Sequence, residues 1–264
     1  MKIYQVDAFT AEKFKGNPAG VCIFDDDKIE NTDLMQKIAL EMNLSETAFL
    51  KKENDEYILR WFTPETEVDF CGHATLSAAH ILYETRVEMY DAEIIFNTLS
   101  GKLISKKKQE MIELNLPQIK ISKIDDVEII NKLLNVKPLF TGYDGKRYLL
   151  EVNSVEELNN ISPDYNFLKD IGRTSFMITC KSNDNLYDFY SRFFAPSVGI
   201  NEDPVTGSAH SYLAPYWGKK LNKKKLTGFQ LSKRTGIINC ELLGDNRVLI
   251  SGNAVTVFEI EMKL

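Results

Sequence analysis

The chain repeats one short sequence half a chain apart. Arg-Trp-Phe-Thr-Pro at residues 60–64 returns as Arg-Phe-Phe-Ala-Pro at residues 192–196, an offset of 192 − 60 = 132 in a chain of 264 residues. Each copy continues through an acidic stretch into a cluster of small residues, Cys-Gly-His-Ala-Thr at 71–75 and Thr-Gly-Ser-Ala-His at 206–210. This period is far too long for a solenoid. It predicts two copies of one domain that face each other across a cleft.

The composition limits the classes of protein that fit. A hydrophobic content of 44% and a charged content of 27% are typical of a globular domain, and no apolar run is long enough to span a membrane. The net charge of −6 argues against nucleic-acid binding, because the lysines at residues 219–225 lack interleaved aromatics and indicate a solvated turn. The N-terminus predicts a strand rather than a signal peptide. Four widely separated cysteines favour a reduced, cytoplasmic setting.

Alternating apolar and polar residues predict a chain dominated by strands. In the first half we expect strands at 3–9, 20–24, 47–51, 57–62, 93–97, 102–106 and 111–116, with helices at 34–42 and 75–82. In the second half, which begins near Ile129, we expect strands at 147–152, 175–180, 187–194, 229–232, 236–242, 247–250 and 254–263, with a helix at 208–217. The predicted class is α+β. Each half is expected to form a curved sheet around one small-residue helix, with domain boundaries at 1–117 (joined by 253–264) and 118–252.

A glycine begins each small-residue helix, Gly72 in the first half and Gly207 in the second. A helix start carries unpaired N–H groups and a partial positive charge, and glycine lets the backbone approach a ligand closely. Two such starts in one cleft would bind a small carboxylate. The alternative is that both glycines only permit tight packing of helix on sheet.

His73 lies at the first helix start, where it could carry a proton, donate to an oxyanion or cap the helix. A metal site is not expected, because His80 lies about 10.5 Å further along the helix, too far to share one ion. Cys71 could be a thiolate, although a buried apolar role is more usual for such a cysteine.

Two carboxylates have candidate roles. Glu46 lies among apolar residues between a helix and a strand, and a carboxyl in a closed cleft has a raised pKa that suits proton transfer. The second copy places Arg173 there, so the copies differ at this position. Asp203, before Pro204 and the second helix start, could orient a substrate or cap the local backbone.

At these residues the chain resembles the PhzF family of phenazine-biosynthesis-like isomerases. The resemblance covers residues 6–9, 16–20, 43–49, 60–75 and 194–210 in family order. It implies a diaminopimelate-epimerase-like fold with two pseudo-symmetric halves, each a barrel-like, mostly antiparallel sheet around a central helix. It also implies a homodimer that needs no cofactor.

The resemblance also assigns roles to residues. Glu46 matches the family's proton-transferring glutamate, and His73, Asp203 and Ser208 match its substrate site. Related epimerases use two cysteines; here Cys71 stands at the first place and Thr206 at the second. We therefore expect an isomerase that moves a proton within a small carboxylate-bearing substrate, held also by backbone N–H groups at Gly72 and Gly207. The alternatives are an epimerase or racemase using Cys71 and a second base, and a non-catalytic small-molecule binding protein.

Overall fold

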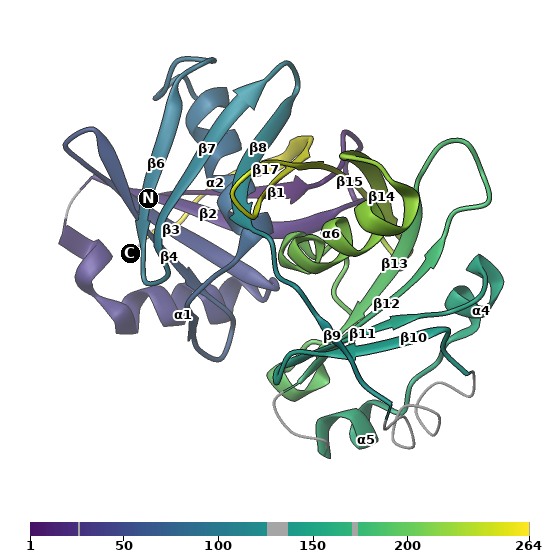
Figure 1. Ribbon diagram of the computed structural model, residues 1–264. Helices are drawn as coiled ribbons and strands as arrows, with labels where there is room; N and C mark the ends of the chain where they lie inside the picture. The colour runs from purple at the N-terminus through teal and green to yellow at the C-terminus, as the bar shows by residue number, and fades with distance from the viewer. Residues whose placement is uncertain (26, 126–136, 171–173, 264) are drawn as a thin grey trace. The chain divides into compact units, whose positions relative to one another are not determined.

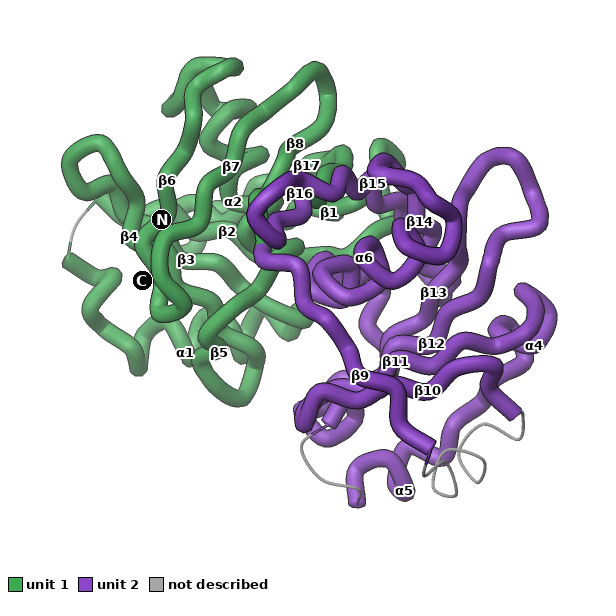
Figure 2. The backbone as a smooth tube through the Cα atoms, in the orientation of Figure 1, with its two compact units in different colours: residues 1–116, 249–264 green, residues 117–248 purple. Residues whose placement is uncertain are grey.

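The computed structural model describes residues 1–25, 27–125, 137–170 and 174–263. The chain divides into two compact units, residues 1–116 with 249–264 and residues 117–248 (Figure 2). Strands dominate both units and helices are few (Figure 1). The expected α+β class is therefore confirmed. Among the described residues, no helix has both the length and the apolar character needed to cross a membrane.

The first unit is built on a mixed sheet, in which some neighbouring strands are parallel and others antiparallel. β2 pairs antiparallel with β1 and parallel with β3, β4 pairs antiparallel with β3 and parallel with β6, and β7 pairs antiparallel with β6 and β8. β17 returns from the end of the chain to pair antiparallel with β1. The strands are β1 (Lys2–Ala8), β2 (Asn17–Phe24), β3 (Glu46–Glu53), β4 (Glu56–Phe62), β5 (Glu67–Val68), β6 (Glu93–Thr98), β7 (Gly101–Lys108), β8 (Met111–Pro117) and β17 (Ala254–Glu261).

The two helices of this unit differ in burial, since α1 (Thr32–Met42) buries one face and α2 (Gly72–Glu84) is almost entirely enclosed. α1 follows the 3-10 turn η1 (Asp27–Glu30), and the side chain of Asn31 accepts a hydrogen bond from the N–H of Leu34 at 3.0 Å, as expected of a helix cap. α2 is buried almost throughout and contacts β1, β2, β3, β7 and β17. Its small residues allow this enclosure, which the sequence predicts.

The second unit carries its own sheet and helices. β11 pairs antiparallel with β10 and parallel with β12, β13 pairs antiparallel with β12 and parallel with β14, and β14 pairs antiparallel with β15. The strands are β9 (Ser122–Lys123), β10 (Phe140–Tyr143), β11 (Arg147–Glu151), β12 (Ser175–Lys181), β13 (Phe189–Phe194), β14 (Lys225–Gln230), β15 (Gly236–Leu242) and β16 (Arg247–Gly252), the last crossing the unit boundary. The helices are α4 (Val155–Asn160), α5 (Tyr165–Asp170) and α6 (His210–Leu221), with 3-10 turns η2 (Pro196–Val198) and η3 (Gly207–Ala209).

The repeat in the sequence is also a repeat in topology. The series β1–β2–β3–β4–β6–β7 runs antiparallel, parallel, antiparallel, parallel, antiparallel, and β10–β11–β12–β13–β14–β15 follows the same order. Helices fall at matching places in the two series. α1 follows the second strand of its series, as α4 and α5 do in theirs, and α2 and α6 each follow the fourth.

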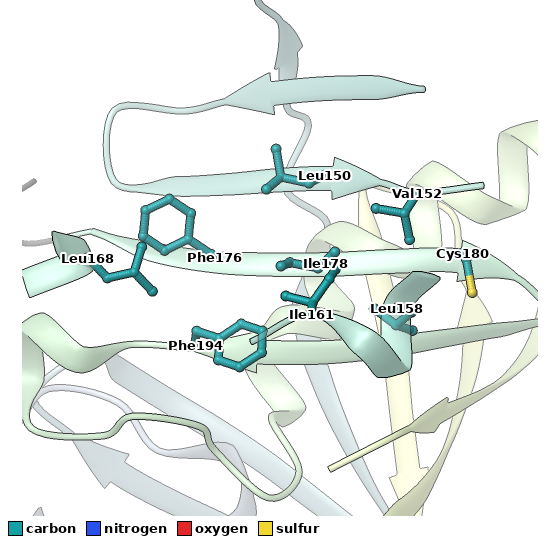
Figure 3. Packing of buried hydrophobic residues seen from close by; sticks show 9 residues of the cluster. All are labelled: Leu150, Val152, Leu158, Ile161, Leu168, Phe176, Ile178, Cys180 and Phe194. Carbon is teal, nitrogen blue, oxygen red and sulfur yellow. The ribbon is translucent and has the colours of Figure 1, made fainter. Parts of the chain in front are cut away.

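Each unit has a hydrophobic core cluster. In the second unit, Leu150, Phe176, Ile178 and Phe194 from three strands meet Leu158 of α4, together with Val152, Ile161, Leu168 and Cys180 (Figure 3). In the first unit, residues of β1, β2, β3 and β4 pack with the buried face of α1. These clusters lie between the sheet and its outer helices, at matching places in the two copies.

The structure corrects several details of the prediction. The expected strand at 229–232 is β14, which ends earlier, at Gln230. The second small-residue helix begins as the 3-10 turn η3 before α6. The lysines at 219–225 are all exposed, as predicted, but they lie at the end of α6, in a short connection and at the start of β14 rather than in one turn. The expected start of the second copy near Ile129 and Arg173 both lie outside the described residues.

Candidate active site

Glu46 is the first residue of β3 and lies beside the buried polar side chains of Asn17 and His73. The turn before it is set by Asn43, whose left-handed backbone (φ 50°) ends α1 and whose N–H donates to the carbonyl of Ala39 at 3.1 Å. β3 runs parallel to β2, with Ala19 opposite Glu46. The side chain of Glu46 is only 12% exposed, so its carboxylate is largely removed from water.

His73, the second residue of α2, is an ionisable neighbour of Glu46. Its Nε2 atom lies 3.2 Å from Oε2 of Glu46, and its side chain is 6% exposed. Burial lowers the pKa of His73 from 6.5 to about 3, because an imidazolium would lose its hydration. The ring is therefore neutral at pH 7.

Asn17, at the start of β2, fixes which ring nitrogen of His73 carries the proton. Its side-chain amide nitrogen lies 3.2 Å from Nδ1 of the histidine. An amide N–H can only donate, so Nδ1 accepts, and a neutral imidazole then holds its proton on Nε2. That Nε2–H group is the one near Glu46. The trio therefore places the Nε2–H group of a neutral imidazole 3.2 Å from the Glu46 carboxylate.

Cys71 completes this group from the residue that precedes α2. Its Sγ atom is buried and lies 3.5 Å from Nδ1 of His73. Glu46, Cys71 and His73 each offer one donor atom, and these three atoms lie within 4.8 Å of one another. They are the described residues that could approach a shared metal ion. The sequence did not reveal this cluster. His80, which the sequence analysis weighed as a metal partner of His73, instead lies 3.1 Å from the hydroxyl of Thr256.

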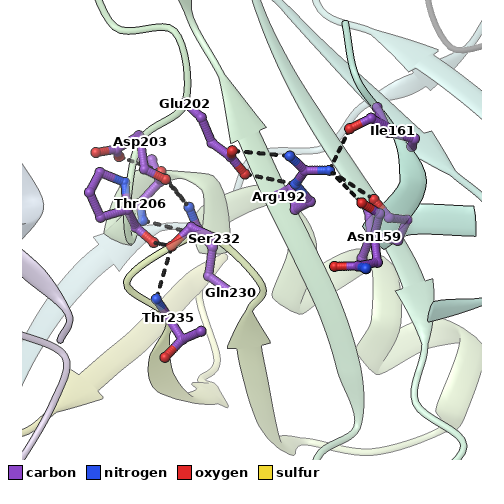
Figure 4. A network of polar contacts seen from close by, with 11 residues as sticks. Asn159, Ile161, Arg192, Glu202, Asp203, Thr206, Gln230, Ser232 and Thr235 are labelled. Carbon is purple, nitrogen blue, oxygen red and sulfur yellow. Dashed lines mark hydrogen bonds and ion pairs between the residues drawn. The ribbon is translucent and has the colours of Figure 1, made fainter. Parts of the chain in front are cut away.

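In the second unit, Asp203 belongs to a tightly bonded loop before α6 (Figure 4). Its carboxylate accepts a hydrogen bond from the hydroxyl of Thr206. Gln230 of β14 donates to the carbonyl of Asp203 at 2.8 Å, and its amide oxygen accepts from the N–H of Thr206 at 2.9 Å. All three residues are buried. This bonding holds the Asp203 carboxylate beside the start of η3, and both the substrate role and the capping role of Asp203 stay predictions.

Ser208 lies half-buried in η3, one residue after the buried Gly207. Its hydroxyl oxygen accepts a hydrogen bond from Nη1 of Arg147 at 3.2 Å. Gly72, in the first unit, is the first residue of α2 and is buried beside His73. The predicted site residues thus form two groups, Glu46 with Gly72 and His73 in the first unit, and Asp203 with Gly207 and Ser208 in the second. A cleft shared by the two helix starts stays a prediction.

The strand registers identify the true counterpart of Glu46. Phe62 pairs with Thr47, and its counterpart Phe194 pairs with Phe176, so Thr47 and Phe176 hold equivalent positions. The equivalent of Glu46 is therefore the residue before Phe176. That residue is Ser175, not Arg173 as the sequence comparison proposed. The copies still differ at this place, because a serine replaces the carboxylate.

Sequence reasoning missed three polar residues at these helix starts: Asn17, Arg147 and Gln230. Asn17 falls within a stretch that carries the family resemblance, and that stretch was its signal. Arg147 and Gln230 had no such signal. Arg147 begins a predicted strand and Gln230 lies within one, and each acquires its contacts only through sheet pairing.

The comparisons with known proteins agree with this fold. Residues 6–260 match the family model described as PhzC-PhzF, phenazine biosynthesis-like protein. The chain belongs to the PhzF family. It is 48% identical over 265 residues to an uncharacterized isomerase of Halalkalibacterium halodurans, which covers 99% of this chain and 98% of that protein.

Solved structures of PhzF proteins share the fold closely. A PhzF family protein of Enterococcus faecalis superposes with a TM-score of 0.93 at 40% identity, covering 100% of this chain and 99% of that one. A putative PhzC/PhzF protein of Clostridium difficile gives 0.92 at 42% identity and covers 100% of both chains. The expected fold and isomerase class of this PhzF protein are therefore confirmed, while its substrate is unassigned.

Proposed function

We propose that this PhzF protein is a cofactor-independent isomerase in which Glu46 alone moves a proton between two carbons of a small carboxylate-bearing substrate. The proposal rests on one observation: Oε2 of Glu46 lies 3.2 Å from Nε2 of a buried, neutral His73. A carboxylate in this position has a fixed orientation and little competing water. General acid–base catalysis needs both conditions.

In the proposed reaction, the ionised Glu46 accepts a proton from one C–H bond of the substrate. The electron pair of that bond delocalises into the adjacent unsaturated system, and the protonated Glu46 then returns the same proton to another carbon. The neutral ring of His73, whose Nε2 atom lies 3.2 Å from Oε2 of Glu46, stays beside the carboxylate through both steps. Atoms and charge balance without a second base, so one glutamate is sufficient.

The remaining predicted site residues have binding roles in this proposal. Asp203 and Ser208 orient the substrate, and the backbone N–H groups near Gly72 and Gly207 hold its carboxylate. A helix start contributes about 0.3–1 kcal/mol to a nearby surface charge and up to ~2 kcal/mol when partly buried. The two helix starts must share one pocket for this to work. A cytoplasmic homodimer is the accompanying expectation.

A second candidate is an epimerase that uses Cys71 as one of two bases. Its support is the 3.5 Å contact between Sγ of Cys71 and Nδ1 of His73. Thr206 weakens it, because Thr206 stands where the related enzymes carry their second cysteine and its hydroxyl donates to Asp203. One thiol cannot serve both faces of a stereocentre.

A metabolite screen in D₂O, read by mass spectrometry, tests the proposal. The protein is incubated with pools of small unsaturated carboxylic acids, and each pool is examined for protein-dependent deuterium gain and for a shifted double bond. The proposal expects isomerisation in which part of the product keeps its original hydrogen, since one base carries the proton. Deuterium entry with inversion at a stereocentre would support the epimerase instead. Tight binding without any exchange would support a binding protein.

A further inference from the structure

The two copies place opposite charges beside their helix starts. In the sequence repeat, Ser208 stands where His73 stands. His73 lies 3.2 Å from the Glu46 carboxylate, whereas Ser208 lies 3.2 Å from the Arg147 guanidinium. Both charged residues come from the same parallel pair of strands, since Ala19 pairs with Glu46 in one copy and Arg147 pairs with Ser175 in the other. The carboxylate lies on the second strand of its pair, β3, and the guanidinium lies on the first strand of the matching pair, β11.

Arg147 is held in a fixed position by aromatic rings. The centre of its guanidinium lies 5.4 Å from the ring of Tyr212 and 5.9 Å from the ring of Phe193. Both rings are buried, and cation–π contact of this kind restricts a long side chain that would otherwise sample many rotamers. The guanidinium is therefore preorganised next to Ser208.

Asp144 supports this arrangement from the turn before β11. Its Oδ1 accepts from the N–H of Arg147 at 2.7 Å, and its Oδ2 accepts from the hydroxyl of Tyr212 at 2.7 Å. Partial burial would raise the pKa of Asp144, but the Tyr212 hydroxyl, the N–H groups of Lys146 and Arg147 and the Arg147 charge together hold it below its ordinary value. Asp144 thus stays ionised and fixes both the backbone of Arg147 and one of the rings under it.

The bonding of Arg147 differs from that of a structural arginine in the same unit. Arg192 uses Nε and Nη2 on both oxygens of Glu202, at 2.7 and 3.0 Å, and Nη1 on the carbonyl of Ile161 at 2.7 Å (Figure 4). Within the described part of the chain, Arg147 has no carboxylate within 4.0 Å, and its side chain bonds to the Ser208 hydroxyl. A guanidinium has five N–H donors, so most of those of Arg147 remain for a ligand.

We propose that Arg147 is a substrate-binding residue of the second copy, which accepts the carboxylate of the substrate through a two-pronged hydrogen bond beside Ser208. This inference rests on the proposed function, because it takes Ser208 as part of the substrate site. It extends that function by naming the residue that selects an anionic over a neutral substrate. In this proposal, one copy of the duplicated domain supplies the proton-transferring residue and the other copy binds the substrate carboxylate.

The experiment compares benzoate with benzamide, which has nearly the same shape but no charge. NMR titration of the full protein follows the backbone amide signal of Ser208, together with the Arg147 Nε–H signal where Arg147 is present, and yields a Kd for each probe. Arg147→Met keeps the aliphatic stem that packs on the rings but removes the charge. Arg147→Lys keeps the charge but cannot donate two parallel hydrogen bonds to a carboxylate. Lys146→Met, at the exposed neighbouring position, is the control. A charge-assisted hydrogen bond contributes about 1.5–3 kcal/mol, so Arg147→Met should weaken benzoate binding about tenfold or more.

The inference expects benzoate to bind more tightly than benzamide, with this preference lost in Arg147→Met, reduced in Arg147→Lys and unchanged in Lys146→Met. It is overturned if benzoate leaves the Arg147 Nε–H signal of the unaltered protein unmoved up to its solubility limit. It is equally overturned if benzoate and benzamide bind alike or if Arg147→Met binds benzoate normally. Arg147-dependent benzoate binding without proton transfer on any substrate would remove the proposed function and leave the anion site standing.

Discussion

The Nε2 atom of His73 lies 3.2 Å from the Oε2 atom of Glu46, and Asn17 sits 3.2 Å from the other ring nitrogen of the histidine. Three elements that are separate in sequence meet here: the start of β2, the start of β3 and the start of α2. The neighbour of Glu46 is therefore a neutral imidazole rather than a cation. Such a partner orients a carboxylate without quenching its basicity as strongly as a charged partner would.

Cys71 should be dispensable if Glu46 is the single acid and base. Cys71→Ala removes a buried sulfur 3.5 Å from Nδ1 of His73 and leaves the Asn17 contact in place. We expect less than a tenfold loss of turnover, since only packing beside the histidine changes; steady-state kinetics on the substrate from the D₂O screen measures it. Alkylation provides the counter-test: stoichiometric inactivation by iodoacetamide at Cys71, prevented by substrate, would favour the epimerase.

The repeated arginines should stabilise their units to similar extents. Arg60 donates Nε and Nη2 to the two oxygens of Glu67, both at 2.7 Å, and Arg192 binds Glu202 in the same way. Removing either guanidinium leaves a partly buried carboxylate unpaired, which costs about 2–3 kcal/mol. Arg60→Met and Arg192→Met should therefore each lower the free energy of unfolding by that amount in urea titrations. The control is Lys181→Met, at an exposed position. Equal free energies of unfolding for all three variants would contradict a stabilising role for the two arginine–glutamate pairs.

His210 should make the protein less stable in mild acid. It is fully buried, with Nδ1 2.9 Å from the carbonyl of Thr206, and burial lowers its pKa from 6.5 to about 4. The unfolded chain binds this proton first, so the stability that His210 contributes is complete above pH 6.5 and is lost as the pH falls towards 4. The loss is about 3 kcal/mol for a shift of this size. His73 adds a loss of the same sign.

Urea unfolding of the unaltered protein and of His210→Asn, at intervals between pH 7 and pH 4, measures this contribution. Asparagine keeps a donor for the Thr206 carbonyl but does not titrate. The variant should therefore show a shallower decline of unfolding free energy with falling pH, whatever its absolute stability. Parallel curves for the two proteins would mean that His210 does not titrate differently on unfolding.

The sequence predicted the parts of the fold that are encoded locally and repeated. Alternating residues located most strands, and the small residues of α2 predicted its enclosure. The short helices α4 and α5 were not predicted, because six residues hold too few turns for an apolar period to stand out. The start of β14 was placed too late, since its first residues continue the lysine-rich segment.

The contacts of the site were less accessible to sequence reasoning. Glu46 and His73 could be named from their surroundings, but the supporting Asn17 depends on the pairing of β2 with its neighbours. Arg147 shows the same limit, since nothing near it in sequence indicates Ser208, Phe193 or Tyr212. The error over Arg173 arose in the same way. Sequence similarity between the two copies aligned Glu46 with Arg173, two residues away from Ser175, the position that the strand registers give.

The most direct test of the account is the loss of proton transfer in Glu46→Gln. The amide keeps the size of the side chain and can still accept from Nε2 of His73, but it cannot take a proton. Glu53→Gln, an exposed position on the same strand, is the matched control. Measured as isomerisation rate in D₂O, Glu46→Gln should lose at least about 10²-fold, the lower range of general acid–base catalysis, while Glu53→Gln keeps the full rate. A folded Glu46→Gln protein that isomerises its substrate at a near-normal rate would contradict the assignment of Glu46.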